Sequence, residues 1–161
     1  MDFVGQPLES WITNHSMNTC KLHQLILDLL SCLKEIHAQG YVHGDVAVWN
    51  IIQRNGHFYL IDYGFAGLSQ LALDPYEAVI QDYVGLCEII GVIKFGRKMS
   101  LPMLADKLDG EMKRFVTFVK DAHSNRWEIV DEEKWLVKLS STLFKKLSHR
   151  IYGTRQDMPI V

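Results

Sequence analysis

The chain has 161 residues, of which 48% are hydrophobic and 22% charged, and its formal net charge is −2. This length and balance are typical of a soluble globular protein, so we expect residues 1–161 to form a single domain in the cytoplasm or nucleus. The slight acidic excess excludes a general attraction to nucleic acid or to an anionic membrane. No apolar run reaches the roughly 18 residues that a membrane span needs, so we expect no such span. The first residues lack the basic region of a secretory signal, so we do not expect secretion.

The first third of the chain is predicted to be mainly helical. Residues 1–8 are apolar and interrupted by Gly5 and Pro7, which indicates a short extended segment before a helix at 9–14. Between residues 19 and 38, apolar side chains recur at spacings of three and four, which predicts a long amphipathic helix. Gly40 is expected to end this helix as a cap residue.

Residues 41–61 predict short strands in place of helix. Residues 41–42, 51–52 and 58–61 are strand-like runs. Asn55 and Gly56 predict a tight hairpin turn between the last two runs, because both residues tolerate positive φ. A hairpin brings its two ends together, so Asn50 and Asp62, which flank it, are expected to be neighbours.

The rest of the chain is predicted to be helical. Residues 76–93 are largely apolar, which indicates a helix buried on most sides, and shorter helices are expected at 101–107, 110–123 and 132–149. Residues 152–161 are expected to form a loose tail. The predicted fold class is mainly α with a small β-hairpin.

The cysteines and most histidines carry no metal-site pattern. Cys20, Cys32 and Cys87 are far apart, and their odd number favours a reducing compartment, so we interpret all three as buried thiols. The histidines without ligand spacing, which we expect at the surface, are His15, His23, His57, His123 and His149.

Polar residues flank the predicted hairpin in a pattern that suits phosphoryl transfer. His43, Asp45 and Asn50 precede it, and Asp62 and Gly64 follow it. This chemistry needs chiefly a carboxylate that orients the attacking hydroxyl, and oxygen ligands for magnesium. Asp45, Asn50 and Asp62 can supply these groups.

The pattern H-G-D-x-x-x-x-N, a hairpin and then I-D-Y-G resembles the catalytic loop and the metal-binding loop of the protein-kinase superfamily, here within residues 41–64. The resemblance implies that Asp45 is the catalytic carboxylate and that Asn50 and Asp62 hold Mg²⁺ in an ATP-dependent reaction. It assigns His43 a place behind the metal-binding loop and Gly64 a supporting role.

Two further segments extend the resemblance to about two thirds of the chain. Asp82 is similar to the aspartate of the family's central helix that hydrogen-bonds the backbone of the catalytic loop. Residues 1–8 resemble the hinge between the two kinase lobes, where the backbone at Asp2 and Val4 would contact adenine. The resemblance therefore implies a kinase-like C-lobe without the β-rich N-terminal lobe.

The sequence also departs from the family pattern. Gly44 replaces the usual arginine, as in atypical kinases and in phosphotransferases of the aminoglycoside and choline types, and Ala47 stands where lysine or histidine is common. Only twenty residues separate Asp62 from Asp82, too few for a full activation segment. Protein and small-molecule acceptors both stay open, with a protein Ser or Thr favoured.

Two functions from different classes follow from the resemblance. In the first, the chain is a phosphotransferase lobe that acts either with an N-lobe supplied by another chain or in a reduced form, with little turnover by itself. In the second, it is a non-catalytic pseudokinase that binds and modulates a kinase or another protein. Such a partner would dock on the face left by the absent lobe, which we expect to be partly apolar.

Overall fold

The structure is a computed structural model that describes residues 5–125. Within this part the chain is mainly helical, with two small antiparallel sheets, and this confirms the predicted fold class at that level. The described residues all belong to one compact unit. Several predictions lie outside the described residues: the helix at 132–149, the tail at 152–161, and the roles of Asp2 and Val4. That residues 1–161 form a single domain therefore stays a prediction.

The long helix α2 covers Thr19–Ala38, the range that the periodicity predicted. It begins at Asn18, whose side chain accepts a hydrogen bond of 2.9 Å from the backbone N–H of Lys21. The C-cap residue is Gln39, and Gly40 follows it in the left-handed region at φ +78°. Gly40 is thus at the position where a left-handed glycine commonly ends a helix, as predicted.

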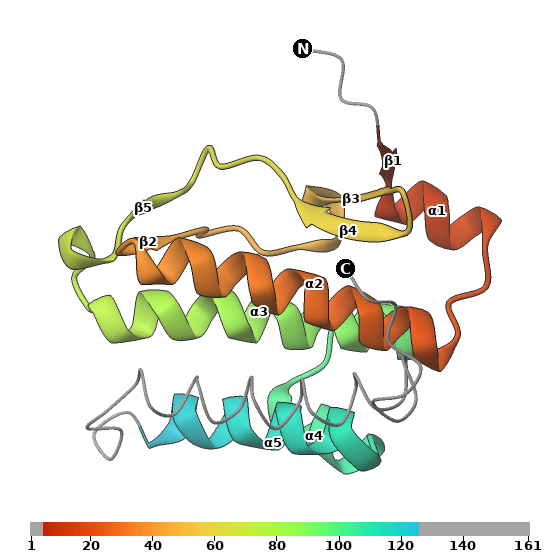
Figure 1. Ribbon diagram of the computed structural model, residues 1–161. Coiled ribbons are helices and arrows are strands. Elements are labelled where there is room, and N and C mark those ends of the chain that lie inside the picture. The colour runs from red at the N-terminus through yellow and green to blue at the C-terminus, as the bar shows by residue number, and fades with distance from the viewer. Residues whose placement is uncertain (1–4, 126–161) are drawn as a thin grey trace, which may run out of the picture. The chain divides into compact units, whose positions relative to one another are not determined.

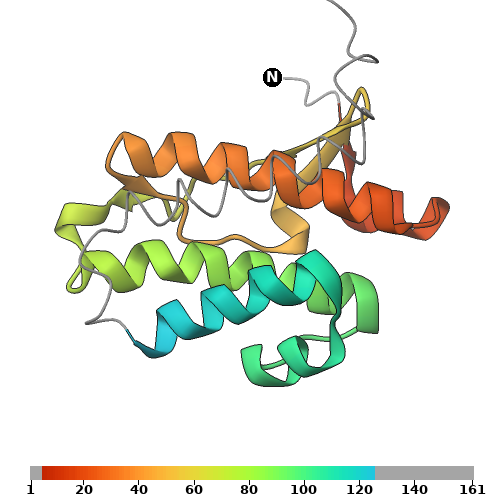
Figure 2. The ribbon, with the colours of Figure 1, turned by 60° about the horizontal axis from the view of Figure 1, so that its bottom comes forward.

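The second long helix, α3, covers Pro75–Phe95, which extends the predicted range slightly at both ends. Asp74 caps it by accepting a 3.0 Å hydrogen bond from the backbone N–H of Glu77, and Gly96 ends it at φ +70°. Figures 1 and 2 both show α2 and α3 side by side and running in opposite directions. The two helices form the frame on which the loops between them rest.

Three strands form the first sheet, in the order β1-β3-β4. Strand β1 is Gln6–Pro7, β3 is Ile51–Arg54 and β4 is His57–Leu60, and all pairings are antiparallel. Asn55 and Gly56 have φ values of +52° and +84°, which confirms the predicted hairpin turn. The backbone N–H of Phe58 donates a 2.9 Å hydrogen bond to Asp28, so β4 is fastened to α2.

A second sheet pairs β2, Tyr41–Val42, with β5, Gly67–Leu68. The pairing is extended by Ser69, whose backbone N–H and hydroxyl both donate to the carbonyl of Gly40, at 2.8 and 3.0 Å. The chain after Asp62 is therefore fixed beside the start of the loop that carries Asp45. The sequence did not predict β5, because one of its two residues is glycine, which is depleted in strands.

Short helices complete the described part. Helix α1 covers Leu8–Asn14, α4 covers Leu101–Lys107 and α5 covers Gly110–Ser124, all close to the predicted ranges. Helix α5 packs against both α3 and α4, and Figures 1 and 2 show α3 between α2 and α5. This position explains why α3 is apolar on most sides. No helix in residues 5–125 is long and apolar enough to cross a membrane.

Two expectations about single side chains are wrong. Cys20 is exposed and Cys32 is half-buried, so Cys87 alone of the three cysteines is a buried thiol. His23 is buried, although it lies outside the predicted apolar stripe. The reason is that α2 packs against β4 and also against α3, so its covered face is wider than one stripe.

The three thiols are expected to differ strongly in reactivity. Burial raises the pKa of the Cys87 thiol, and the charge of Glu88 raises it further. Because only the thiolate attacks a disulfide reagent, a raised pKa slows the reaction. In the native chain we expect Cys20 to react with a disulfide reagent at once, and Cys87 only after unfolding in urea. Thiol titration of Cys20→Ser and Cys87→Ser variants would assign each reaction, and rapid modification of native Cys87 would contradict the packing of α3.

Candidate active site

The loop of residues 43–47 connects β2 to the 3-10 turn η1, Val48–Asn50. Val46, Ala47 and Val48 are buried, so the loop is anchored in the core by its own apolar side chains. Gly85 of α3 lies directly beneath it, because a Cβ atom at this position would stand 2.5 Å from the carbonyl oxygen of Val46. The close approach holds the loop against α3.

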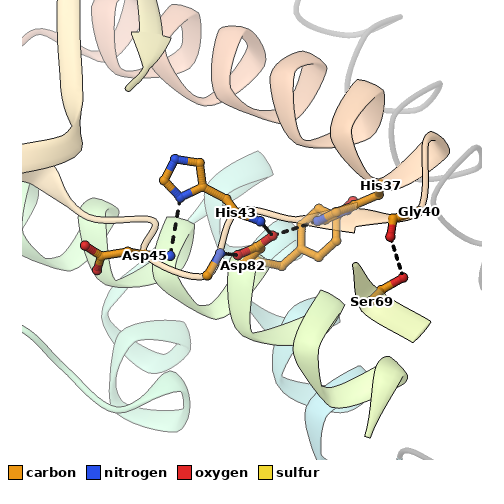
Figure 3. A network of polar contacts seen from close by, with 8 residues as sticks. His37, Gly40, His43, Asp45, Ser69 and Asp82 are labelled. Carbon is orange, nitrogen blue, oxygen red and sulfur yellow. Dashed lines mark hydrogen bonds and ion pairs between the residues drawn. The ribbon is translucent and has the colours of Figure 1, made fainter. Parts of the chain in front are cut away.

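Asp82 of α3 is the centre of a buried polar network, which Figure 3 shows. Its Oδ2 accepts a 2.8 Å hydrogen bond from the backbone N–H of His43, and its Oδ1 accepts one of 2.9 Å from that of Gly44. Hydrogen bonds to a carboxylate are among the stronger ones in proteins. The Asp82 side chain therefore fixes the backbone conformation of the two residues before Asp45. This is the hydrogen bonding that the resemblance implied for Asp82.

His37, near the end of α2, is a member of this network that the sequence analysis missed. Its Nε2 lies 2.8 Å from Asp82 Oδ2, and its Nδ1 lies 3.2 Å from the hydroxyl of Tyr83. The side chain is almost fully buried. The sequence could have indicated this role, because His37 lies four residues after Leu33 and so continues the apolar stripe of α2. A histidine on a buried stripe needs a polar partner. Asp82 thus joins α2, α3 and the loop.

His43 is fully buried and connects the loop with the end of the hairpin. Its Nε2 lies 3.2 Å from the carbonyl oxygen of Ile61, which can only accept, so Nε2 carries the ring proton. Nδ1 is then free to accept the 3.3 Å hydrogen bond from the backbone N–H of Asp45. The ring also packs against Tyr63, at 4.9 Å between centroids. A neutral His43 therefore connects the backbone at Asp45 with residues 61–63.

Asp45 and Asn50 face each other across the loop. The amide nitrogen of Asn50 donates to the backbone carbonyl of Asp45 at 2.9 Å and to its Oδ2 at 2.7 Å. Trp49 Nε1 lies 3.5 Å from the same Oδ2. Both amide hydrogens of Asn50 are therefore used on Asp45, and the amide oxygen of Asn50 is the atom that remains for a ligand.

Asp62 follows the hairpin directly. The backbone N–H of Ile61 donates a 2.9 Å hydrogen bond to the carbonyl of Asn50, which continues the pairing of Ile51 with Leu60 and places Asp62 next to Asn50. Asp62 has φ +61°, a conformation that Asp and Asn adopt more readily than other residues with a side chain. Its carboxylate is exposed and accepts a 3.1 Å hydrogen bond from the N–H of Gly64.

Tyr63 fastens this segment to α2. Its hydroxyl lies 3.7 Å from Cys32 Sγ, although about half of the residue is exposed. Burial of the hydroxyl end raises the pKa of Tyr63 to about 12, and the hydrogen bond with Cys32 and the charge of Glu35 add to the shift. The phenol is therefore neutral at physiological pH and holds the chain next to Asp62 in place.

Gly44 is required by the chain that crosses it. Its φ is +81°, and a Cβ atom here would stand 2.6 Å from the carbonyl oxygen of Phe65. Any side chain would thus clash with the backbone of the segment after Gly64. Glycine at position 44 therefore has a steric reason in this structure.

An open cavity of about 180 Å³ adjoins Asp45. The loop contributes Gly44 and Asp45 to its lining, and η1 contributes Trp49. Helix α3 and the loop after it contribute Glu88 and Lys98. A group that enters this cavity reaches the Asp45 carboxylate. The arrangement is suited to an acceptor hydroxyl.

Two side chains with oxygen donors, Asn50 and Asp62, lie beside the hairpin. Within residues 5–125 no three His, Cys, Asp or Glu side chains lie together as a metal site. Magnesium, however, commonly takes one or two protein oxygens and keeps several waters. The amide oxygen of Asn50 and the exposed carboxylate of Asp62 are donors of this type, carried by neighbouring parts of the backbone.

The structure thus links His43, Asp45, Asn50 and Asp82 in one network, and places Asp62 and Gly64 at its edge. No protein-family model and no curated protein sequence matches the chain. The roles of these residues are therefore inferred from their geometry and chemistry.

Proposed function

We propose that this chain is the large lobe of a protein-kinase-like phosphotransferase, which moves a phosphoryl group from ATP to a hydroxyl group. A Ser or Thr side chain of a protein is the favoured acceptor. The observation that supports this best is the continuous network from Asp82 through the loop to His43 and Ile61. It fixes a partly exposed carboxylate, Asp45, beside a pair of oxygen donors.

Asp45 is the proposed catalytic carboxylate. It would accept a hydrogen bond from the acceptor hydroxyl in the adjoining cavity and take its proton as the oxygen attacks phosphorus. Asn50 holds the Asp45 carboxylate in this orientation through its 2.7 Å hydrogen bond. Asn50 and Asp62 would hold magnesium, which, when bound, neutralises charge on the phosphate oxygens. We propose that a kinase-like N-terminal lobe completes the nucleotide site.

The test is transfer of the γ-phosphoryl group to hydroxyl acceptors, with and without a complementing kinase N-lobe. We expect Asp45→Asn to lower the rate by about 10²- to 10⁴-fold, the contribution usual for a general base. Asn at this position keeps an oxygen that can accept the hydrogen bond from Asn50. Thermal unfolding should therefore be nearly unchanged, and a variant as active as the native chain would contradict the assignment.

A second function, a non-catalytic module that binds and modulates a kinase or another protein, is favoured by one observation. Large apolar side chains are exposed along the segment after Gly64: Phe65 is 75% exposed, Leu71 80% and Leu73 fully. Exposed apolar clusters commonly mark protein interfaces. For this function, Asp45→Asn should leave the affinity for the partner unchanged, and Phe65→Ser with Leu73→Ser should lower it.

A further inference from the structure

The region beside Asp45 is rich in carboxylates. Asp45, Asp82 and Glu88 line the cavity of about 180 Å³, and Glu9 joins Glu88 in lining a neighbouring cavity of about 90 Å³. Lys98 lines both cavities and is the one cationic side chain in either lining among the described residues. Surroundings of this kind favour a positively charged ligand over a negative one.

Lys98 already occupies a small cation site between the two cavities. Its Nζ lies 2.6 Å from Glu88 Oε2 and 5.8 Å from the ring centroid of Trp49. A carboxylate and the face of an indole are the two groups that bind ammonium and guanidinium groups best. Trp49 itself reaches Asp45 through its Nε1, at 3.5 Å from Oδ2. A cation held here is therefore a short distance from the proposed catalytic carboxylate.

The internal contact is easy to displace. The side chains of Lys98 and Glu88 are 59% and 36% exposed, and ion pairs at such positions contribute little to stability. Lys98 belongs to the loop between α3 and α4, so its side chain can turn to solvent without loss of a helix. An external cation could then take its place against Glu88 and Trp49.

We propose that Glu88 and Trp49 form the cation-binding part of the acceptor pocket, and that Lys98 fills it in the free protein. The acceptor would carry an ammonium or guanidinium group a few bonds from its hydroxyl. The main cavity is slightly larger than the roughly 150 Å³ that accommodates a benzene ring, so it takes one side chain or a small alcohol. The role as acceptor pocket rests on the proposed phosphotransferase function, whereas the binding itself does not.

The test measures binding by calorimetry without ATP. One probe is ethanolamine, and the other is a serine peptide with an arginine close to the serine. Matched neutral probes are ethylene glycol and the same peptide with glutamine in place of arginine. Lys98→Ala is expected to bind a cationic probe about fivefold more tightly than the native chain, because no internal cation competes. In that background, Glu88→Gln should lower the affinity at least about tenfold.

The outcomes are distinct. Binding of the peptide alone identifies a basic protein substrate, and binding of ethanolamine alone identifies a small amino alcohol; both support the cation site. Equal binding of charged and neutral probes, or no gain in Lys98→Ala, would overturn it, provided that thermal unfolding shows the variant folded. Because ATP is absent, a chain without phosphotransfer activity can still pass this test.

Discussion

Asp82→Ala is expected to lower the free energy of unfolding by about 3–5 kcal/mol. The substitution leaves the buried backbone N–H of His43 and the part-buried backbone N–H of Gly44 without their acceptor, and it removes the partner of His37. Each buried polar group without a partner costs about 1–3 kcal/mol. Urea unfolding, followed by far-UV circular dichroism, measures the effect.

A matched control is available on α4. Asp106 is exposed there, and Asp106→Ala removes the same charge with an expected effect of less than about 0.5 kcal/mol. If Asp82→Ala changed the unfolding free energy no more than Asp106→Ala, the network around Asp82 would not be what holds the loop.

Gly44→Ala is expected to destabilise the chain by about 3 kcal/mol, clearly more than Gly40→Ala. Both glycines have positive φ, at +81° and +78°, so both substitutions carry the backbone cost of about 1–2 kcal/mol. Only at Gly44 does the new Cβ also meet the carbonyl of Phe65, at 2.6 Å, whereas at Gly40 it meets nothing within 4 Å. Overpacking of this kind adds about 1–3 kcal/mol.

Comparison of Gly44→Ala with Gly40→Ala separates the cost of the steric clash from the cost of the positive φ. The segment that carries Phe65 cannot move freely, because Tyr63 contacts α2 on one side and β5 pairs with β2 on the other. Urea unfolding of both variants gives the difference. Equal losses for Gly44→Ala and Gly40→Ala would show that the segment after Gly64 does not press on the loop.

Local patterns in the sequence were sufficient for the helices and the hairpin. The periodicity of α2 and the Asn55-Gly56 pair act through neighbours in the chain, so they predicted elements at the observed positions. The register of β3 with β4 then accounts for the proximity of Asn50 and Asp62.

Contacts between segments that are distant in the sequence could not be predicted from such local patterns. The link of His37 with Asp82, 45 residues apart, depends on how α2 and α3 pack, and the burial of His23 depends on the same packing. The steric need for Gly44 becomes visible only when the segment at Phe65 is in place. The pocket lined by Trp49, Glu88 and Lys98 likewise brings together residues of η1, of α3 and of the loop after α3.

The central claim is that Asn50 and Asp62 bind magnesium together with ATP, and calorimetric titration of the purified chain tests it most directly. Asp62→Asn is the informative variant, since Asn also tolerates φ +61° and the substitution removes only the charge. Asp106→Asn is the control for net charge. We predict magnesium-dependent ATP binding that Asp106→Asn keeps and Asp62→Asn loses; no binding at millimolar ATP, or equal binding by Asp62→Asn, would contradict the claim.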